Sequence, residues 1–366
     1  MPSSKICIIG AGAAGLVTAK HAIKDGHEVE LFEQTDSVGG TWVYSEKTGC
    51  HSSMYKIMKT NLPKEAMLFQ DEPFREDLPS FMSHEDVLEY LVDYSKNFPI
   101  QFNTTVTDVR RDGEKWKVTT STNSNQPASH FYDAVFVCNG HFFEPLNPYE
   151  NSEFEGEMIH SHDYRRAEHF EGKTVVIVGA GPVYENGVVT DEGERIYADV
   201  IIVCTGYVFK FPFLDSSLIQ LKHNDLMVSP LYQHLCHVDY PDSLFFIGLP
   251  LGTITFPLFE VQAKYALSLI SGTGKLPPDT SKIQNFEARR LQGLQNPGAF
   301  HILVEEQWDY MKELAEMGGF EKWSYMETIR KLYCYIMSER KKNVIGYKMV
   351  NFEMNEDETD FRVVGI

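Results

Sequence analysis

Three glycines near the N-terminus have the spacing of a dinucleotide-binding turn. Gly10, Gly12 and Gly15 form the pattern G-x-G-x-x-G, with an apolar run at 6–9 before them and a helix-like stretch after them. In such a turn the first glycine permits a tight bend, the second lets the backbone approach a diphosphate, and the third lets a helix pack closely on a strand. The N-terminus of that helix stabilises the phosphate charge. The spacing therefore predicts a site for a dinucleotide cofactor.

An acidic residue after the turn strengthens this prediction. Glu33 ends the next strand-like run, 18 residues beyond Gly15, where a carboxylate can accept hydrogen bonds from both ribose hydroxyls. A carboxylate there disfavours a ribose 2′-phosphate, so FAD or NAD fits better than NADP. The order strand, glycine turn, helix, strand over residues 5–33 is typical of the start of a Rossmann-like α/β fold. The alternative is a glycine turn of such a fold that holds no cofactor.

A second glycine turn is incomplete. The run "VVIVGAGP" at 175–182 supplies Gly179 and Gly181, but Tyr184 stands at the third position and only about two dozen residues separate Gly181 from Cys204. A βαβ unit needs roughly 30 residues, and the residues here have turn-like and strand-like character with no amphipathic helix. We therefore predict that a contiguous block is missing after Pro182, leaving a hairpin that feeds a buried strand. A naturally minimal domain is the alternative.

Loss of such a block has a physical consequence. Removing parallel strands and their helices should leave strand edges and apolar side chains exposed, which favours poor folding or aggregation.

Composition limits the partners. The 366-residue chain has 43% hydrophobic residues, enough to bury the core of two domains, and its formal net charge is -19. Such a charge repels nucleic acid, so we predict small-molecule partners and no nucleic acid. No segment reaches the roughly 20 apolar residues that a membrane-spanning helix needs, so we predict no transmembrane segment. The six cysteines are scattered singly, which favours a reducing compartment and disfavours a redox dithiol.

Longer motifs match one known family. They are, in chain order, "SVGGTW" at 37–42, "KTNLPKEAM" at 59–67, "FMSHEDVLEYL" at 81–91, "VCNGHFFEP" at 137–145 and "CTGY" at 204–207. The pattern F-x-G-x-x-x-H-x-x-x-[FY] is met by Phe154, Gly156, His160 and Tyr164. By these motifs the chain resembles the flavin-containing monooxygenases of the animal type, including insect members, with a truncated NADPH-binding domain.

The resemblance implies a fold and a domain order. It implies an α/β protein with a Rossmann-like FAD-binding domain, of the two-dinucleotide-binding-domain flavoprotein type, and a shortened second nucleotide-binding domain. The expected segments are 1–165 for the first part of the FAD domain, 166–225 for the residual NADPH domain and linker, and 226–366 for the return to the FAD domain with C-terminal helices. Helical periodicity in the region 257–340 supports the last segment.

The resemblance also implies a reaction. In this family NADPH reduces FAD, the reduced flavin reacts with O2 to form a C4a-hydroperoxide, and one oxygen is transferred to a soft nitrogen or sulfur nucleophile. The expected substrate is a small amine or sulfide, metabolic or xenobiotic. An FAD-binding but catalytically impaired chain, unable to use NADPH, is the alternative. A flavin disulfide reductase is disfavoured because no paired cysteines occur.

Site residues follow from the matched motifs. Asn61 matches the asparagine beside the flavin ring and is the catalytic candidate. The three histidines of 160–169 lack a metal-ligand framework, so we predict no metal. The expected cofactor contacts are Gly10, Gly12, Ala13, Ala14, Gly15, Glu33, Gly39, Gly40, Thr41, Trp42, Asn61, Val106 and Gln262 for FAD, and Gly179 and Gly181 for NADPH.

Cellular context is less constrained. We expect a cytoplasmic protein, with peripheral association with the endoplasmic reticulum membrane left open, and the sequence does not decide whether the chain forms a homo-oligomer.

Overall fold

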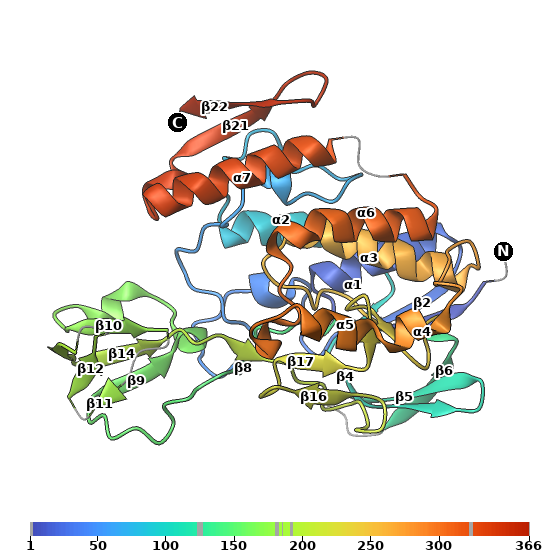
Figure 1. Cartoon of the computed structure of the whole chain (residues 1–366), viewed down its shortest axis with the longest axis horizontal. Coiled ribbons are helices and arrows are strands. Elements are labelled where there is room, and N and C mark those ends of the chain that lie inside the picture. The colour runs from blue at the N-terminus through green and yellow to red at the C-terminus, as the bar shows by residue number, and fades with distance from the viewer. Residues whose placement is uncertain are drawn as a thin grey trace.

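The larger body of the protein is built on one mixed sheet. The computed structural model describes residues 3–122, 127–179, 183–184, 186–190, 193–321 and 325–365. Its seven-stranded sheet has the order β18-β19-β20-β7-β1-β2-β3, in which β20, β7, β1, β2 and β3 run parallel (Figure 1). The strands are β1 (Lys5–Ile9), β2 (Glu28–Phe32), β3 (Ile100–Gln101), β7 (Ala134–Val137), β18 (Leu231–Tyr232), β19 (Cys236–His237) and β20 (Leu244–Phe246).

Helices cover one face of this sheet. Helix α1 (Ala13–Lys24) packs against α3 (Thr255–Ile270), which in turn packs against α6 (Gln307–Gly318), and α2 (His84–Tyr94) lies beside them (Figure 1). Side chains alternate across a strand, so Ile6 and Ile8 of β1 join the helix-side core. Helix α2 begins at a capping box, in which the Ser83 and Asp86 side chains each bind the other's backbone N–H.

A three-stranded meander covers the other face. It consists of β4 (Thr104–Asp112), β5 (Lys115–Thr122) and β6 (Ala128–Tyr132), in that order. Cys7 and Ile9, the alternate side chains of β1, pack on this side with Val109 and Trp116 of the meander. The strand β1 and its glycine turn are therefore fixed between two cores. The pair β16 (Gln220–Lys222) and β17 (Met227–Ser229) lies near the meander (Figure 1).

A smaller second domain lies apart from this body, at the left of Figure 1. Its parallel sheet has the order β10-β14-β9, formed by β10 (Val175–Val178), β14 (Val200–Val203) and β9 (Glu157–His160). A second, antiparallel sheet contains β11 (Val183–Tyr184), β12 (Gly187–Val189) and β13 (Arg195–Tyr197). The two chain passages to the larger body pair as β8 (Glu144–Pro145) and β15 (Tyr207–Val208). The predicted hairpin feeding a buried strand is confirmed.

Strand pairing places the domain boundaries differently from the segments expected from the sequence. Strand β9 pairs with β14 and so belongs to the second domain, although it precedes residue 166. Phe209, Phe211 and Phe213 pack in the meander-side core of the larger body, although they precede residue 226. The second domain therefore corresponds to residues 146–206, because the β8–β15 pair marks where the chain leaves and re-enters the larger body.

The second domain exposes apolar surface. Strand β10 lies at an edge of its sheet, and Ile177 in its middle is 69% exposed. The described residues between β10 and β14 contain strands and turns but no helix, so no helix packs on Ile177 from that part of the chain. The expected exposure of apolar side chains is confirmed.

The C-terminal part returns to the helical side of the larger body. Helix α7 (Met326–Lys342) and the hairpin of β21 (Val350–Met354) and β22 (Phe361–Gly365) form its outermost layer (Figure 1). Helices α4 (Thr280–Gln284) and α5 (Phe286–Gln292) precede α6. Along the described chain, no helix is both long and apolar enough to cross a membrane. Short 3₁₀ helices are η1 (Gly40–Trp42), η2 (Lys64–Ala66), η3 (Ser161–Asp163), η4 (Ala167–Phe170), η5 (Pro297–Ala299), η6 (Val304–Glu306) and η7 (Gly346–Lys348).

Candidate functional site

The turn between β1 and α1 excludes side chains at two of its glycines. Gly10 has a φ of +102°, and a Cβ atom there would lie 2.6 Å from the carbonyl oxygen of Cys138. A Cβ atom on Gly15 would lie 1.9 Å from the carbonyl oxygen of Gly10. Both distances are far below van der Waals contact, so these two glycines are required for the turn itself. Their predicted structural roles agree with this geometry.

The middle glycine faces open space above the helix N-terminus. A Cβ atom on Gly12 would meet only Gly40, at 3.7 Å, which is ordinary contact. No side chain caps α1 at Gly12, and the first N–H groups of a helix have no partner within the helix. Gly40 approaches Gly12 backbone to backbone, and the Gly39 N–H donates to the Ala11 carbonyl at 3.0 Å. The result is a backbone-lined cradle, which is the candidate site for a diphosphate.

The predicted site residues around this cradle differ in their exposure to solvent. Ala14, Thr41 and Trp42 are half-buried, whereas Ala13 and Gly39 are buried. The Trp42 ring packs edge-on against Phe256 of α3, with ring centroids 6.2 Å apart. The segment 39–42, predicted from the sequence as part of the site, is thus brought against the N-terminus of α1.

Glu33 is buried and already accepts three hydrogen bonds. Its Oε2 atom accepts from the Ala11 N–H, and its Oε1 atom accepts from both the N–H and the hydroxyl of Thr35, each at 2.8 Å. A carboxylate has about four acceptor positions. Glu33 therefore has room for one further donor, so it can bind one ribose hydroxyl directly while these contacts persist. The expectation that it accepts from both hydroxyls requires Thr35 or Ala11 to move.

Val106 lies on the strand whose first residue, Thr104, contacts the backbone of Glu33. It belongs to the edge strand β4, next to an irregularity in the pairing with β5. Two residues earlier, the Thr104 N–H donates to the Glu33 carbonyl at 2.9 Å. The Val106 side chain is buried in the meander-side core, so its backbone is the part that it can offer to a cofactor.

Asn61 is exposed, and its side-chain orientation is fixed from the C-terminal part of the chain. Its Oδ1 atom accepts from Lys348 Nζ at 2.9 Å and, more weakly, from the Tyr347 hydroxyl at 3.4 Å. Burial, together with the nearby positive charges of Arg340 and Lys59, lowers the pKa of Lys348 to about 8. The sequence motifs did not include Lys348, because it lies 287 residues from Asn61 and no motif marks it.

Gln262, an expected FAD contact, lies in the interior of the larger body, and its contact with FAD stays a prediction. It is 0% exposed. Its Oε1 atom accepts from the Gly248 N–H at 2.9 Å, and its Nε2 atom donates to the Tyr310 hydroxyl at 2.8 Å. Its amide links α3, α6 and the segment after β20.

The second glycine turn lies largely outside the described residues. Gly179 is exposed, and a Cβ atom on it would meet no atom within 4 Å. Gly181, predicted as an NADPH contact, lies outside the described residues. In the described part of 178–200 the chain continues into β11, β12 and β13 rather than into a helix. The described residues between Gly179 and β14 supply no helix N-terminus for a second diphosphate, so they do not fit NADPH in the manner of the first site.

The segment carrying His160 and Tyr164 joins the two domains. The Tyr164 ring packs against Tyr55 of the larger body, with ring centroids 5.5 Å apart. Arg165, which the sequence did not single out, is buried and donates to the carbonyl oxygens of Lys47 and Ser52 across the junction. The segment therefore has a structural role. Within the described ranges, no group of three or more His, Cys, Asp or Glu side chains could hold a metal ion.

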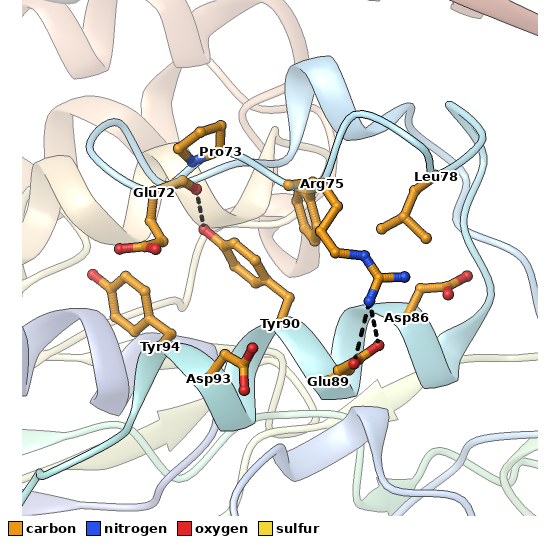
Figure 2. A pocket seen from close by; sticks show the side chains of 10 residues that line it. Glu72, Pro73, Arg75, Leu78, Asp86, Glu89, Tyr90, Asp93 and Tyr94 are labelled. Carbon is orange, nitrogen blue, oxygen red and sulfur yellow. Dashed lines mark hydrogen bonds and ion pairs between the residues drawn. The ribbon is translucent and has the colours of Figure 1, made fainter.

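A separate pocket beside α2 is unsuited to the cofactor. It has a volume of about 140 Å³ and is lined by four carboxylates, of Glu72, Asp86, Glu89 and Asp93. Figure 2 shows Arg75 reaching across it to Glu89, at 3.3 Å. Ligand pockets usually measure 300–1,000 Å³, and the carboxylates would repel a diphosphate. The backbone cradle at Gly12 is the better candidate site.

The chain is similar in sequence to known proteins. The family model described as "Flavin-binding monooxygenase-like" matches residues 3–185 and 181–322. "Flavin-containing monooxygenase FMO GS-OX5" of Arabidopsis thaliana is 31% identical over 404 aligned positions, which cover 89% of this chain and 88% of the relative. Since these relatives are plant proteins, the resemblance to the animal type in particular stays a prediction.

Two solved structures share the fold over nearly the whole chain. The S-allyl-L-cysteine S-oxygenase from Allium sativum has a TM-score of 0.85 and 29% identity, and covers 95% of each chain. Tmm from Pelagibacter sp. strain HTCC7211 has a TM-score of 0.85 and 27% identity, covering 99% of this chain and 96% of the other. The predicted Rossmann-like flavoprotein fold is confirmed.

The comparisons also locate the missing block. The two family-model matches meet at 181–185, immediately after the second glycine turn. The alignment with the Arabidopsis relative has 404 positions and includes 89% of this 366-residue chain, which is about 326 residues. About 78 aligned positions of the relative therefore have no counterpart in this chain. The cradle, the motif order and the matched ranges lead to one conclusion: the chain belongs to the flavin-binding monooxygenase-like family.

Proposed function

We propose that this chain binds FAD at the α1 cradle and acts as a flavin-dependent monooxygenase with a weakened or lost ability to be reduced by NADPH. Members of the family are flavin monooxygenases that use FAD and NADPH. Bound FAD supplies the electron transfer and the activation of O2, while the protein binds and orients the reactants. The observation that carries the proposal is the contrast between the two glycine turns: the first leads into helix α1, whereas the described residues that follow the second form strands and no helix before β14.

The chain's own residues have separable tasks in this proposal. The backbone at Gly12 and Gly40, with the N-terminus of α1, binds the diphosphate. Glu33 binds a ribose hydroxyl. Asn61, held by Lys348, presents its amide at the flavin ring, where it can donate a hydrogen bond without transferring a proton.

A small thioether is the substrate class that we favour. One structural relative is named an S-oxygenase for S-allyl-L-cysteine. A thioether sulfur is a soft nucleophile, as the family reaction requires. Amines remain the second class to test, because the family resemblance covers both nucleophiles.

Full NADPH-dependent turnover is the second candidate function. Family membership favours it, since the chain spans 88% of the length of the Arabidopsis relative. It requires NADPH to bind without the helix that follows the second glycine turn in a complete nucleotide-binding unit.

One experiment distinguishes the two candidates. The purified chain is examined for bound flavin by its absorption spectrum, then mixed anaerobically with NADPH, and in parallel with dithionite as a control reductant. Both samples are finally exposed to O2 and a thioether, and sulfoxide is quantified. We expect bound FAD, slow or no bleaching by NADPH, and sulfoxide after dithionite reduction.

Each contrary result has a definite meaning. Rapid bleaching by NADPH would establish the complete cycle and refute the weakened reduction. Protein that binds no FAD would refute the cradle assignment. Flavin that dithionite reduces but that yields neither sulfoxide from the thioether nor, in a parallel sample with a tertiary amine, amine oxide would refute the monooxygenase activity.

A further inference from the structure

The C-terminal segment reaches the Asn61 loop through Lys348 and, more weakly, through the Tyr347 hydroxyl, which lies 3.4 Å from Asn61 Oδ1. Lys348 Nζ lies 2.9 Å from Asn61 Oδ1 and 2.9 Å from the carbonyl oxygen of Lys59. Lys348 thereby bridges two acceptors that are two residues apart in the loop. Asn61 itself is exposed, so without Lys348 only the weaker Tyr347 contact would restrain its amide.

This contact determines which way the Asn61 amide faces. A lysine ammonium group carries only hydrogen-bond donors, so the amide atom that faces it must be the oxygen. The Asn61 NH2 group is consequently turned away from Lys348. The loop therefore presents two donor hydrogens rather than an acceptor on its free side.

Lys348 is itself held in place by the packing of its neighbours. Tyr347 is buried and packs edge-on against Phe81, with ring centroids 5.4 Å apart. The Ser80 N–H donates to Asn351 Oδ1 at 2.8 Å. The segment around η7 is thus fixed to residues 80–81 on both sides of Lys348, which makes the lysine a defined partner rather than a freely rotating surface side chain.

We propose that Lys348 is a positioning residue for the oxygenation step: it holds the Asn61 amide with its NH2 group toward the flavin ring. This inference rests on the proposed function, in which Asn61 lies beside the flavin. The oriented NH2 group then donates a hydrogen bond to oxygen reacting at the flavin. An ammonium donor makes a stronger contact than a neutral one, which suits a residue whose task is to fix an exposed amide.

The test compares single and double variants. Lys348→Met removes the donors, Lys348→Arg retains donors, and Asn61→Ala removes the amide. Lys341→Met, at an exposed position on α7, is the control because it removes the same charge elsewhere. Each variant is loaded with FAD, reduced with dithionite and mixed with O2 and a thioether. The readouts are the ratio of sulfoxide to hydrogen peroxide and the rate of flavin reoxidation by O2.

We expect the Lys348→Met variant to bind FAD like the unchanged protein but to form about tenfold less sulfoxide per flavin oxidised, the loss that one hydrogen bond of ordinary strength would give. Lys348→Arg should restore most of this ratio, and Lys341→Met should not change it. In the Asn61→Ala background, Lys348→Met should have little further effect, because the two residues act as one unit.

A Lys348→Met variant with the ratio and the reoxidation rate of the unchanged protein would overturn the inference. So would fully multiplicative losses in the double variant, because they would mean that Lys348 acts independently of Asn61. Absence of sulfoxide from the unchanged protein would refute the proposed function instead. The reoxidation rate still tests Lys348 in that case, since equal rates in the unchanged protein, Asn61→Ala and Lys348→Met contradict positioning.

Discussion

The substitution Gly12→Ala should separate FAD binding from folding. Gly12 has φ −78° and ψ −177°, an extended conformation that alanine adopts readily. The added methyl group would meet only Gly40, at 3.7 Å. The free energy of unfolding of the polypeptide should therefore change by no more than about 0.5 kcal/mol.

In the proposed site the diphosphate lies against the Gly12 backbone, so the same methyl group should crowd it. Overpacking at a close contact costs about 1–3 kcal/mol, which corresponds to an increase of about 5- to 150-fold in the dissociation constant of FAD. The assay is fluorescence titration of flavin-stripped protein with FAD, together with urea unfolding of the same preparation.

Two further glycines supply matched comparisons. Gly15→Ala places a methyl group 1.9 Å from the carbonyl oxygen of Gly10, so it should destabilise the fold itself. Gly179→Ala meets no atom within 4 Å, so it should change neither stability nor FAD affinity. Unaltered FAD affinity in the Gly12→Ala variant would refute the location of the diphosphate. A large loss of stability in that variant would refute the open geometry around Gly12.

Three other predictions concern burial and charge. Gln262→Leu should destabilise the fold by about 1–3 kcal/mol in urea unfolding, because the Gly248 N–H loses the amide oxygen that accepts its hydrogen bond. Weaker FAD binding by the folded variant would contradict a purely structural role of Gln262. Burial lowers the pKa of His301 to about 3, so the unfolded chain binds a proton more readily. The stability that His301 contributes is present above about pH 6.5 and falls by about 1.4 kcal/mol per pH unit as the pH drops toward 3. His301→Gln should flatten this part of the plot of unfolding free energy against pH. An unchanged slope would contradict the lowered pKa of His301. Ile177→Lys should reduce aggregation, measured by light scattering, with a stability change within about 0.5 kcal/mol, and unchanged scattering would show that this strand is not the associating surface.

Local sequence patterns predicted the elements whose conformation depends on neighbouring residues. The spacing of Gly10, Gly12 and Gly15 indicated the first cradle, because each glycine acts within one turn. The short interval after Gly179 likewise indicated the missing helix, since a crossover cannot form in so few residues. The helices of 257–340 followed from the periodicity of their apolar side chains.

Such local patterns did not predict contacts between segments that are distant in the sequence. Gln262 matched a motif, yet its amide is hydrogen-bonded to Gly248 and Tyr310 in the interior. Glu33 had the right type and spacing, yet Thr35 and Ala11 occupy most of its acceptor positions. Which hydrogen bonds a side chain retains for a ligand depends on its neighbours in space.

The sequence alone determined the family pattern, the first nucleotide-binding turn and the loss of the second, because these depend on residue types at short, fixed separations. Only the tertiary structure decided where the two domains divide, that Ile177 is left uncovered and that Lys348 orients Asn61. The physical reason is that strand pairing, burial and a hydrogen bond across 287 residues arise from packing, which no short-range spacing records.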